Sequence, residues 1–73
     1  MGKDFMKKEN YEIYSVQIAP DYNDDIFLSE DLDDCVRFID DNDYRLGVDC
    51  RITKLLCTFD GIVLSELEHI ERI

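Results

Sequence analysis

The chain has 73 residues, 45% of them hydrophobic, and a formal net charge of −10. A chain of this length forms one small domain that buries only about 60% of its unfolded surface, so it has little room for an enclosed pocket. The excess of acids argues against direct binding to nucleic acid, whose phosphates require a basic protein face. No apolar run reaches the length of a transmembrane helix.

Residues 1–10 are predicted to be a mobile leader, because three of the eight bases gather there before the first periodic segment begins. Residues 11–73 are predicted to form a single α+β domain. Its hydrophobic residues are plentiful and periodic, which argues against the disorder that a high net charge alone would suggest.

The first predicted element is a strand over residues 11–19, rich in β-branched and aromatic residues. Alternation places Tyr14, Val16 and Ile18 on the core face. Tyr11 and Ile13 fall on the other face, where a partner or a second subunit could cover them. Residues 20–28 are predicted to be a loop whose end, Ile26-Phe27-Leu28, returns to the core.

A helix is predicted over residues 30–42, with Ser29 as its N-cap. Leu32, Cys35, Val36 and Ile39 recur at helical spacing and form an apolar stripe. The opposite face carries four acids and one base, which are Asp33, Asp34, Arg37, Asp40 and Asp41.

The last predicted elements are a strand over residues 48–59 and a partner strand from Ile62 to Glu66, joined by a two-residue turn at Asp60-Gly61. The alternation changes phase inside residues 48–59, so a bulge near Thr53-Lys54 is predicted to restore one core face. Residues 67–73 fit either a strand or a capped helix, and strand is favoured. The predicted fold is β-α-β-β, a two-layer domain with a three-stranded, mainly antiparallel sheet and one helix on one face.

The acids are concentrated in one stretch: residues 21–43 hold ten acids and one base. Solubility requires a smaller and more mixed set of charges, so this stretch predicts a surface that meets a positive partner. Three of the acids lie near the predicted helix C-terminus, where the helix dipole disfavours negative charge. The residues predicted to bind the partner are Asp24, Asp25, Glu30, Asp31, Asp33, Asp34, Asp40, Asp41 and Asp43, with Tyr22 and Tyr44 as interface anchors.

No catalytic residue, metal site or cofactor is predicted, and the chain is not expected to be an enzyme. Asp21, Asn23 and Asp25 match part of a calcium loop, but Ile26 and Leu32 stand where the loop needs Gly and Glu. The three cysteines fall at apolar positions and are predicted to be buried, reduced thiols, which suits a reducing cytosol.

The pattern of a strand, the acidic helix Ser-Glu-Asp-Leu-Asp-Asp-Cys-Val-Arg-Phe-Ile-Asp-Asp and a hairpin closed by Asp-Gly resembles small acidic phage-encoded inhibitor proteins, including several anti-CRISPR proteins. The resemblance spans residues 11–68 and is architectural, so it carries over no functional residue. It implies an inhibitor that acts by occlusion in the cytosol of a bacterial host.

The expected function is therefore a non-enzymatic interaction protein that imitates nucleic acid. Its carboxylates would occupy a basic nucleic-acid-binding groove of a bacterial defence nuclease or CRISPR effector complex. The alternative is a small regulatory or ligand-sequestering module that forms homo-oligomers, a homodimer among them, and whose acidic face only keeps it soluble.

Overall fold

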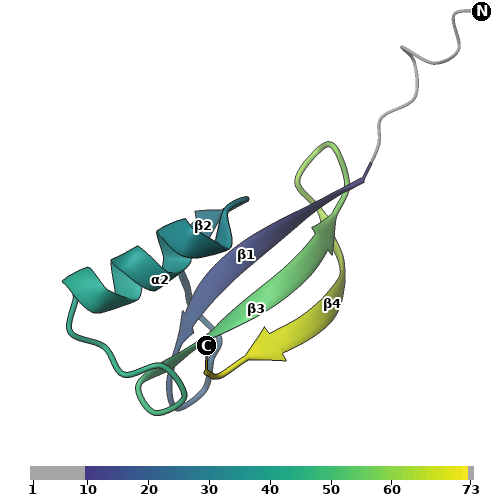
Figure 1. Ribbon diagram of the computed structural model, residues 1–73. Helices are drawn as coiled ribbons and strands as arrows, with labels where there is room; N and C mark the ends of the chain where they lie inside the picture. The colour runs from purple at the N-terminus through teal and green to yellow at the C-terminus, as the bar shows by residue number, and fades with distance from the viewer. Residues whose placement is uncertain (1–9, 73) are drawn as a thin grey trace, which may run out of the picture.

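The computed structural model describes residues 10–72, so all but the last residue of the predicted leader lies outside the described part. The elements are β1 (Tyr11–Ile18), β2 (Asp25–Ser29), α2 (Leu32–Asp41), β3 (Cys50–Cys57) and β4 (Val63–Ile70). They form one open antiparallel sheet of order β2-β1-β3-β4, with α2 on one face (Figure 1).

The α+β class with one helix is confirmed, and the three predicted strands are all present. The fourth strand, β2, lies inside the segment predicted to be a loop, except for its last residue, Ser29. Its five residues start at Asp25 directly after a run of turn-forming residues, so the sequence signal is that of a turn. Pairing with β1 makes the segment a strand, and a register shift near Val16 lets Asp25 stand opposite Gln17.

The helix is shorter than predicted at both ends, and its N-cap is Asp31 instead of Ser29. The Asp31 carboxylate accepts a hydrogen bond from the Asp33 amide at 3.0 Å. Ser29 stabilises the turn before the helix, because its hydroxyl accepts from the Asp31 amide and donates to the Asp34 carboxylate, both at 3.0 Å. Asp31 is also a residue type that caps helices well, and it stands two residues after the predicted Ser29.

The core lies between α2 and the two central strands. Val16 and Ile52 stand opposite each other on β1 and β3, and Cys35 and Ile39 of α2 pack on them together with Cys50. All five are buried. The predicted core face of β1 is therefore confirmed, and burial of a side chain such as Ile52 contributes roughly 1.5–3 kcal/mol.

The predicted bulge in β3 is wrong. The pairing of β1 with β3 runs without a register shift from Tyr11 opposite Cys57 to Ile18 opposite Cys50. The irregularities belong to the pairing of β3 with β4, where β4 has the extra residues. The phase change in β3 is real, since Ile52 faces the helix and Leu55 the other side, and both are buried.

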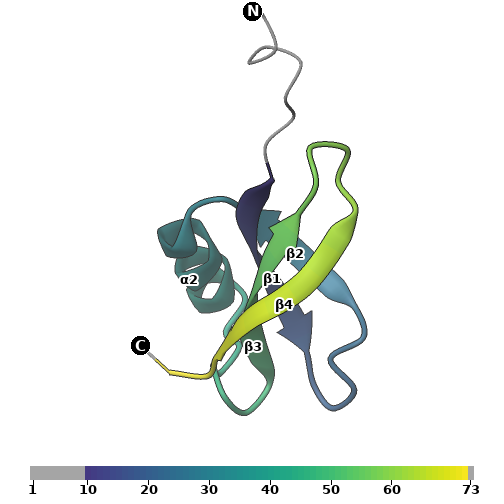
Figure 2. The ribbon, with the colours of Figure 1, turned by 90° about the vertical axis from the view of Figure 1, so that its right-hand side faces the viewer.

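The hairpin turn lies where predicted but is longer than two residues. It spans residues 58–62, and the Thr58 amide donates to the Ile62 carbonyl at 2.8 Å. Gly61 has φ +92° there, a backbone conformation that favours glycine. The strand favoured for the last segment is confirmed as far as Ile70. Figure 2 shows the edge strand β4 in front, with α2 to its left.

Candidate functional site

The outer surface of α2 carries the predicted acidic site. Cys35 and Ile39 fix the orientation of the helix because both are buried against the sheet. Asp33, Asp40 and Asp41 therefore project outward and are exposed, while Asp34 is half-buried. We call these four carboxylates the acidic helix face.

Only one ion pair lies within the acidic helix face, among the residues that the structure describes. Arg37 Nη1 stands 3.7 Å from Asp34 Oδ1, and the two side chains are 70% and 46% exposed. An exposed pair of this kind contributes about 0–1 kcal/mol. Since Asp34 also accepts a hydrogen bond from Ser29, it is partly committed to the fold, and Asp33, Asp40 and Asp41 are the carboxylates left for a partner.

The C-terminal end of α2 concentrates negative charge where the helix dipole opposes it. The last turn holds no basic residue, and Asn42 follows as the C-cap. Its side-chain Nδ2 donates a hydrogen bond to the Phe38 carbonyl at 2.8 Å. The exposed Asp43 comes next and has φ +60°. Negative charges at this end destabilise a helix by about 0.3–1 kcal/mol each at low salt.

The other predicted partner-binding residues divide into two groups. Asp24, Glu30 and Asp31 are exposed around β2 and the start of α2, although the Asp31 side chain serves as the N-cap. Asp25 lies on the sheet face opposite the helix, because its carboxylate accepts hydrogen bonds from β1 side chains on that face.

The two tyrosines predicted as anchors are engaged within the molecule. The ring of Tyr22 lies beneath the Arg51 guanidinium, at 4.3 Å from the ring centroid, a favourable cation–π geometry. Tyr44 is half-buried against Phe38, with ring centroids 6.4 Å apart. The structure therefore does not bring the tyrosines and the acidic helix face together as one exposed surface.

A hollow of about 200 Å³ lies between α2 and β2 at the border of the acidic helix face. The rings of Phe27 and Phe38 stack there with centroids 4.5 Å apart, and Asp34, Arg37 and Asp41 complete the lining. An aromatic surface beside carboxylates suits a guanidinium or ammonium group, which can stack on the ring and pair with the acids. This combination was not predicted from the sequence.

On the opposite face of the sheet, a polar network connects all four strands. Gln17 lies at its centre and is only 6% exposed. Its Nε2 donates to Asp25 Oδ1 at 3.0 Å, and its Oε1 accepts from Arg51 Nε at 3.0 Å and from Thr53 Oγ1 at 2.8 Å. Ser15 donates to the same Asp25 oxygen at 2.7 Å.

The network continues to β4 through Thr53, and its partners fix the direction of the hydrogen bonds. The Gln17 amide cannot be reversed, because Asp25 only accepts and Arg51 only donates. The single Thr53 hydroxyl proton therefore goes to Gln17, so His69 Nδ1 must donate to Thr53 over 3.0 Å. His69 Nε2 then stands 3.4 Å from Glu66 Oε1. No buried side-chain nitrogen or oxygen lacks a partner in the described part of the chain, so this network is structurally satisfied.

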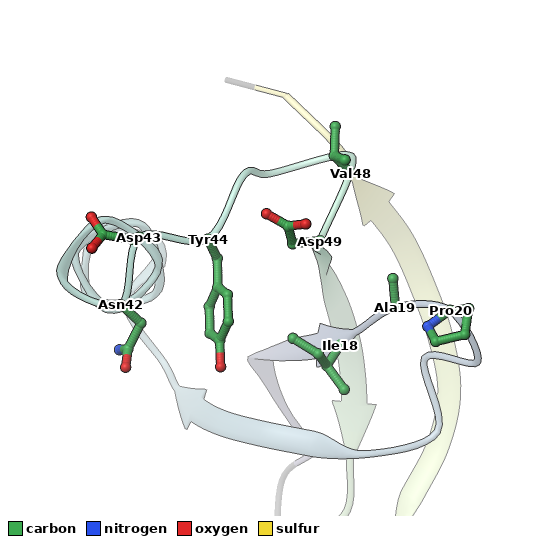
Figure 3. Close-up of a pocket in the computed structure, with 8 residues that line it drawn as sticks. All are labelled: Ile18, Ala19, Pro20, Asn42, Asp43, Tyr44, Val48 and Asp49. Atoms are coloured by element: carbon green, nitrogen blue, oxygen red, sulfur yellow. The ribbon is translucent and has the colours of Figure 1, made fainter.

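A pocket of about 520 Å³ lies where the β1–β2 turn approaches the segment between α2 and β3 (Figure 3). The Tyr44 ring projects into it, and Asp49 points toward Tyr44. The Asp49 carboxylate is engaged within the molecule, because it accepts hydrogen bonds from the Arg45 backbone amide at 2.8 Å and from Arg45 Nε at 3.2 Å. The Arg45 side-chain hydrogen bond is the main cause that lowers the pKa of Asp49. The pocket shows no nucleophile beside a base.

The three cysteines are free and buried, as predicted. Burial is the main cause that raises the pKa of Cys35 to about 11, and it also raises the pKa of Cys50. Protonated thiols are poor nucleophiles and poor metal ligands. No group of three or more His, Cys, Asp or Glu side chains in residues 10–72 could hold a metal ion.

No protein-family model, curated protein or solved structure matches the chain. Among the helical residues that the structure describes, none belongs to a helix long and apolar enough to span a bilayer.

Proposed function

We propose that this protein is a non-enzymatic interaction protein whose acidic helix face binds a basic surface of another protein. The observation that carries the proposal is the state of Asp33, Asp40 and Asp41. They are exposed on one face, and no basic side chain of the described chain pairs with them.

The position of these acids supports binding over simple solubility. Asp40 and Asp41 oppose the helix dipole and repel each other and Asp43. Lysine or arginine side chains from a partner would remove both penalties on binding and would add charge-assisted hydrogen bonds. Opposite fields would also speed the encounter of the two proteins.

The partner surface that best matches this face is a lysine- and arginine-lined groove that otherwise holds the phosphates of DNA or RNA. We propose a defence nuclease or CRISPR effector complex in the cytosol of a bacterial host as the partner, with occlusion of the groove as the mechanism. An arginine of that groove would fit the hollow formed by Phe27 and Phe38.

The test is competition with labelled nucleic acid for binding to purified nucleases and CRISPR effector complexes. The full chain is compared with the Asp40→Lys/Asp41→Lys variant. The matched control is Asp60→Lys/Glu71→Lys, which makes the same change in net charge at exposed positions outside the helix.

The wild-type chain and the control are expected to displace nucleic acid from the same target, and displacement should weaken as salt rises. The helix variant should lose at least about tenfold in affinity, since two charge pairs become repulsions. Equal loss in both variants would mean that net charge alone matters, and failure to displace nucleic acid from any target would refute the mechanism.

A further inference from the structure

The β4 strand is an exposed edge with apolar side chains. It is eight residues long, and seven of them are exposed. Val63 and Leu64 are each 51% exposed and Leu67 is 45% exposed. An edge strand of this length presents a row of backbone donors and acceptors to any strand that approaches it.

The apolar surface extends beyond β4 into the hairpin turn. Phe59 and Ile62 are 57% and 63% exposed, so five of the seven exposed large hydrophobic residues in the described chain lie within residues 59–67. These five residues concentrate exposed apolar surface in one hairpin, and such a concentration commonly marks an interaction site.

β4 lacks two of the usual protections of an edge, although it carries the charged residues Glu66 and Glu68. It contains no Lys and no Pro, the residues that commonly block edge pairing. The register shifts in its pairing with β3 skip Leu64 and Leu67, so the extra residues in β4 are both leucines. The irregularities therefore add apolar side chains to the edge.

No second layer covers this half of the sheet. The α2 helix packs against β2 and β1 and lies away from β4, as both views of the ribbon show (Figures 1 and 2). The uncovered surface is thus not a gap in the core. It is the outer side of a hairpin that extends past the helix.

The distribution of charge indicates what covers it. Residues 21–49 hold eleven acids and two bases, whereas residues 50–72 hold four acids and three bases. Within β4, Glu66 lies beside His69 and Glu68 lies opposite Lys54. Two copies of this chain would therefore repel each other much less through their β4 edges than through their helices. The edge is therefore the surface at which a second copy can approach despite the net charge of −10.

We infer that two copies of this chain pair β4 with β4 antiparallel across a twofold axis, which joins their sheets into one. A twofold pairing covers both edges with the same eight-residue strand and then closes. Pairing β4 with β2 of another copy would use a strand of only five residues, beside Asp24, Asp25 and Glu30, and would leave open edges at both ends.

This dimer goes beyond the proposed function and is compatible with it. The α2 helix packs on β2 and β1, at the opposite edge of the sheet from β4. Both acidic helix faces would therefore remain exposed in the dimer. A partner with two basic sites would then bind with higher avidity than a monomer could give.

The test is sedimentation equilibrium of the full chain over a wide concentration series, with two double variants. Leu64→Lys/Leu67→Lys places charge on the β4 edge. Leu28→Lys/Val48→Lys is the matched control, with the same change in charge at two apolar residues that are 53% and 56% exposed elsewhere. Circular dichroism establishes that each variant is folded.

The molecular mass measured for the wild-type chain and for the control should be twice the 8.6 kDa of one chain, and that of the β4 variant should be 8.6 kDa. A monomeric wild type, equal dissociation of both variants, or growth beyond the dimer would overturn the inference. If the β4 variant does not fold, hydrogen exchange of wild-type β4 amides decides: protection should rise with protein concentration, and protection that ignores concentration refutes the dimer.

The same measurement separates this inference from the proposed function. Added salt should leave the dimer intact, because apolar contacts and backbone hydrogen bonds hold it, whereas salt should weaken docking of the helix. Asp40→Lys/Asp41→Lys should likewise remain dimeric while it loses the partner.

Discussion

The two halves of the sheet differ in both cover and charge. The half formed by β2 and β1 has α2 packed over it, and most acids of the described residues lie around it. The half formed by β3 and β4 is nearly neutral and leaves apolar side chains exposed on its edge. In a chain this small, one ten-residue helix covers only half of a four-stranded sheet. The covered half carries exposed carboxylates on its outer surface, and the uncovered half retains the exposed apolar edge at which we propose that a second copy pairs.

The sharpest test of this contrast compares one apolar residue from each half. Ile39→Ala removes a side chain that is 3% exposed on the buried side of α2, and should lower the free energy of unfolding by about 3 kcal/mol. Leu64→Ala removes a side chain that is 51% exposed, and should change the free energy of unfolding by less than about 0.5 kcal/mol at low protein concentration. Urea denaturation measures both. Equal losses would show that β4 belongs to the core.

The polar network connects the two halves, and Thr53 is its buried junction between β1 and β4. Thr53→Val preserves shape but removes the hydroxyl from Gln17 and His69, and should destabilise the fold by about 1–3 kcal/mol. Thr53→Ser keeps the hydroxyl and should retain most of the stability. Thermal unfolding compares them, and a valine variant as stable as the serine variant would show that the network is dispensable.

Within the acidic half, two aspartates of α2 should have opposite effects on stability. Asp31→Ala removes the N-cap and should cost about 1 kcal/mol. Asp40→Asn removes a charge that opposes the dipole and should stabilise the protein by about 0.3–1 kcal/mol at low salt. Salt should shrink the second effect. Chemical denaturation at two ionic strengths checks both signs, and destabilisation by Asp40→Asn would contradict our account of that helix end.

An effect confined to alkaline pH concerns Cys35, on the buried side of α2. Its pKa is about 11 in the folded chain against 9.0 for an ordinary thiol. Below pH 9 both states keep the proton, so Cys35 adds no pH dependence. As pH rises from 9 to 11 the unfolded state releases the proton first, so stability should fall. The wild-type chain should lose more stability over this range than Cys35→Ala, and identical pH profiles would refute the assignment.

The helix and the central strands were predictable because their own residues specify them. The spacing of Leu32, Cys35, Val36 and Ile39 gives the helix and its buried side, and the outward direction of the acids follows from it. The β2 strand was not predictable, since its short sequence becomes a strand only through pairing with β1. The N-cap was misplaced for a different reason, because Ser29 and Asp31 are equally suitable by residue type.

The polar network was missed because its members lie far apart in sequence and meet only through strand register. Arg51 and Gln17 are 34 positions apart. A signal was present: Ser15 and Gln17 share one parity on the first strand, and Arg51 and Thr53 share one parity on another. Recognising it required the register of β1 against β3, which single-strand patterns do not provide.

That long-range pairing also bears on how the chain reaches its fold. The β1–β2 and β3–β4 hairpins join strands that are neighbours in sequence, whereas β1 and β3 pair across the whole helical segment between them. Closing so long a loop costs entropy before the central contacts can repay it. A high contact order of this kind predicts that the protein folds more slowly than a helical bundle of equal length. Both hairpins would then form early, and their docking would be the slow step.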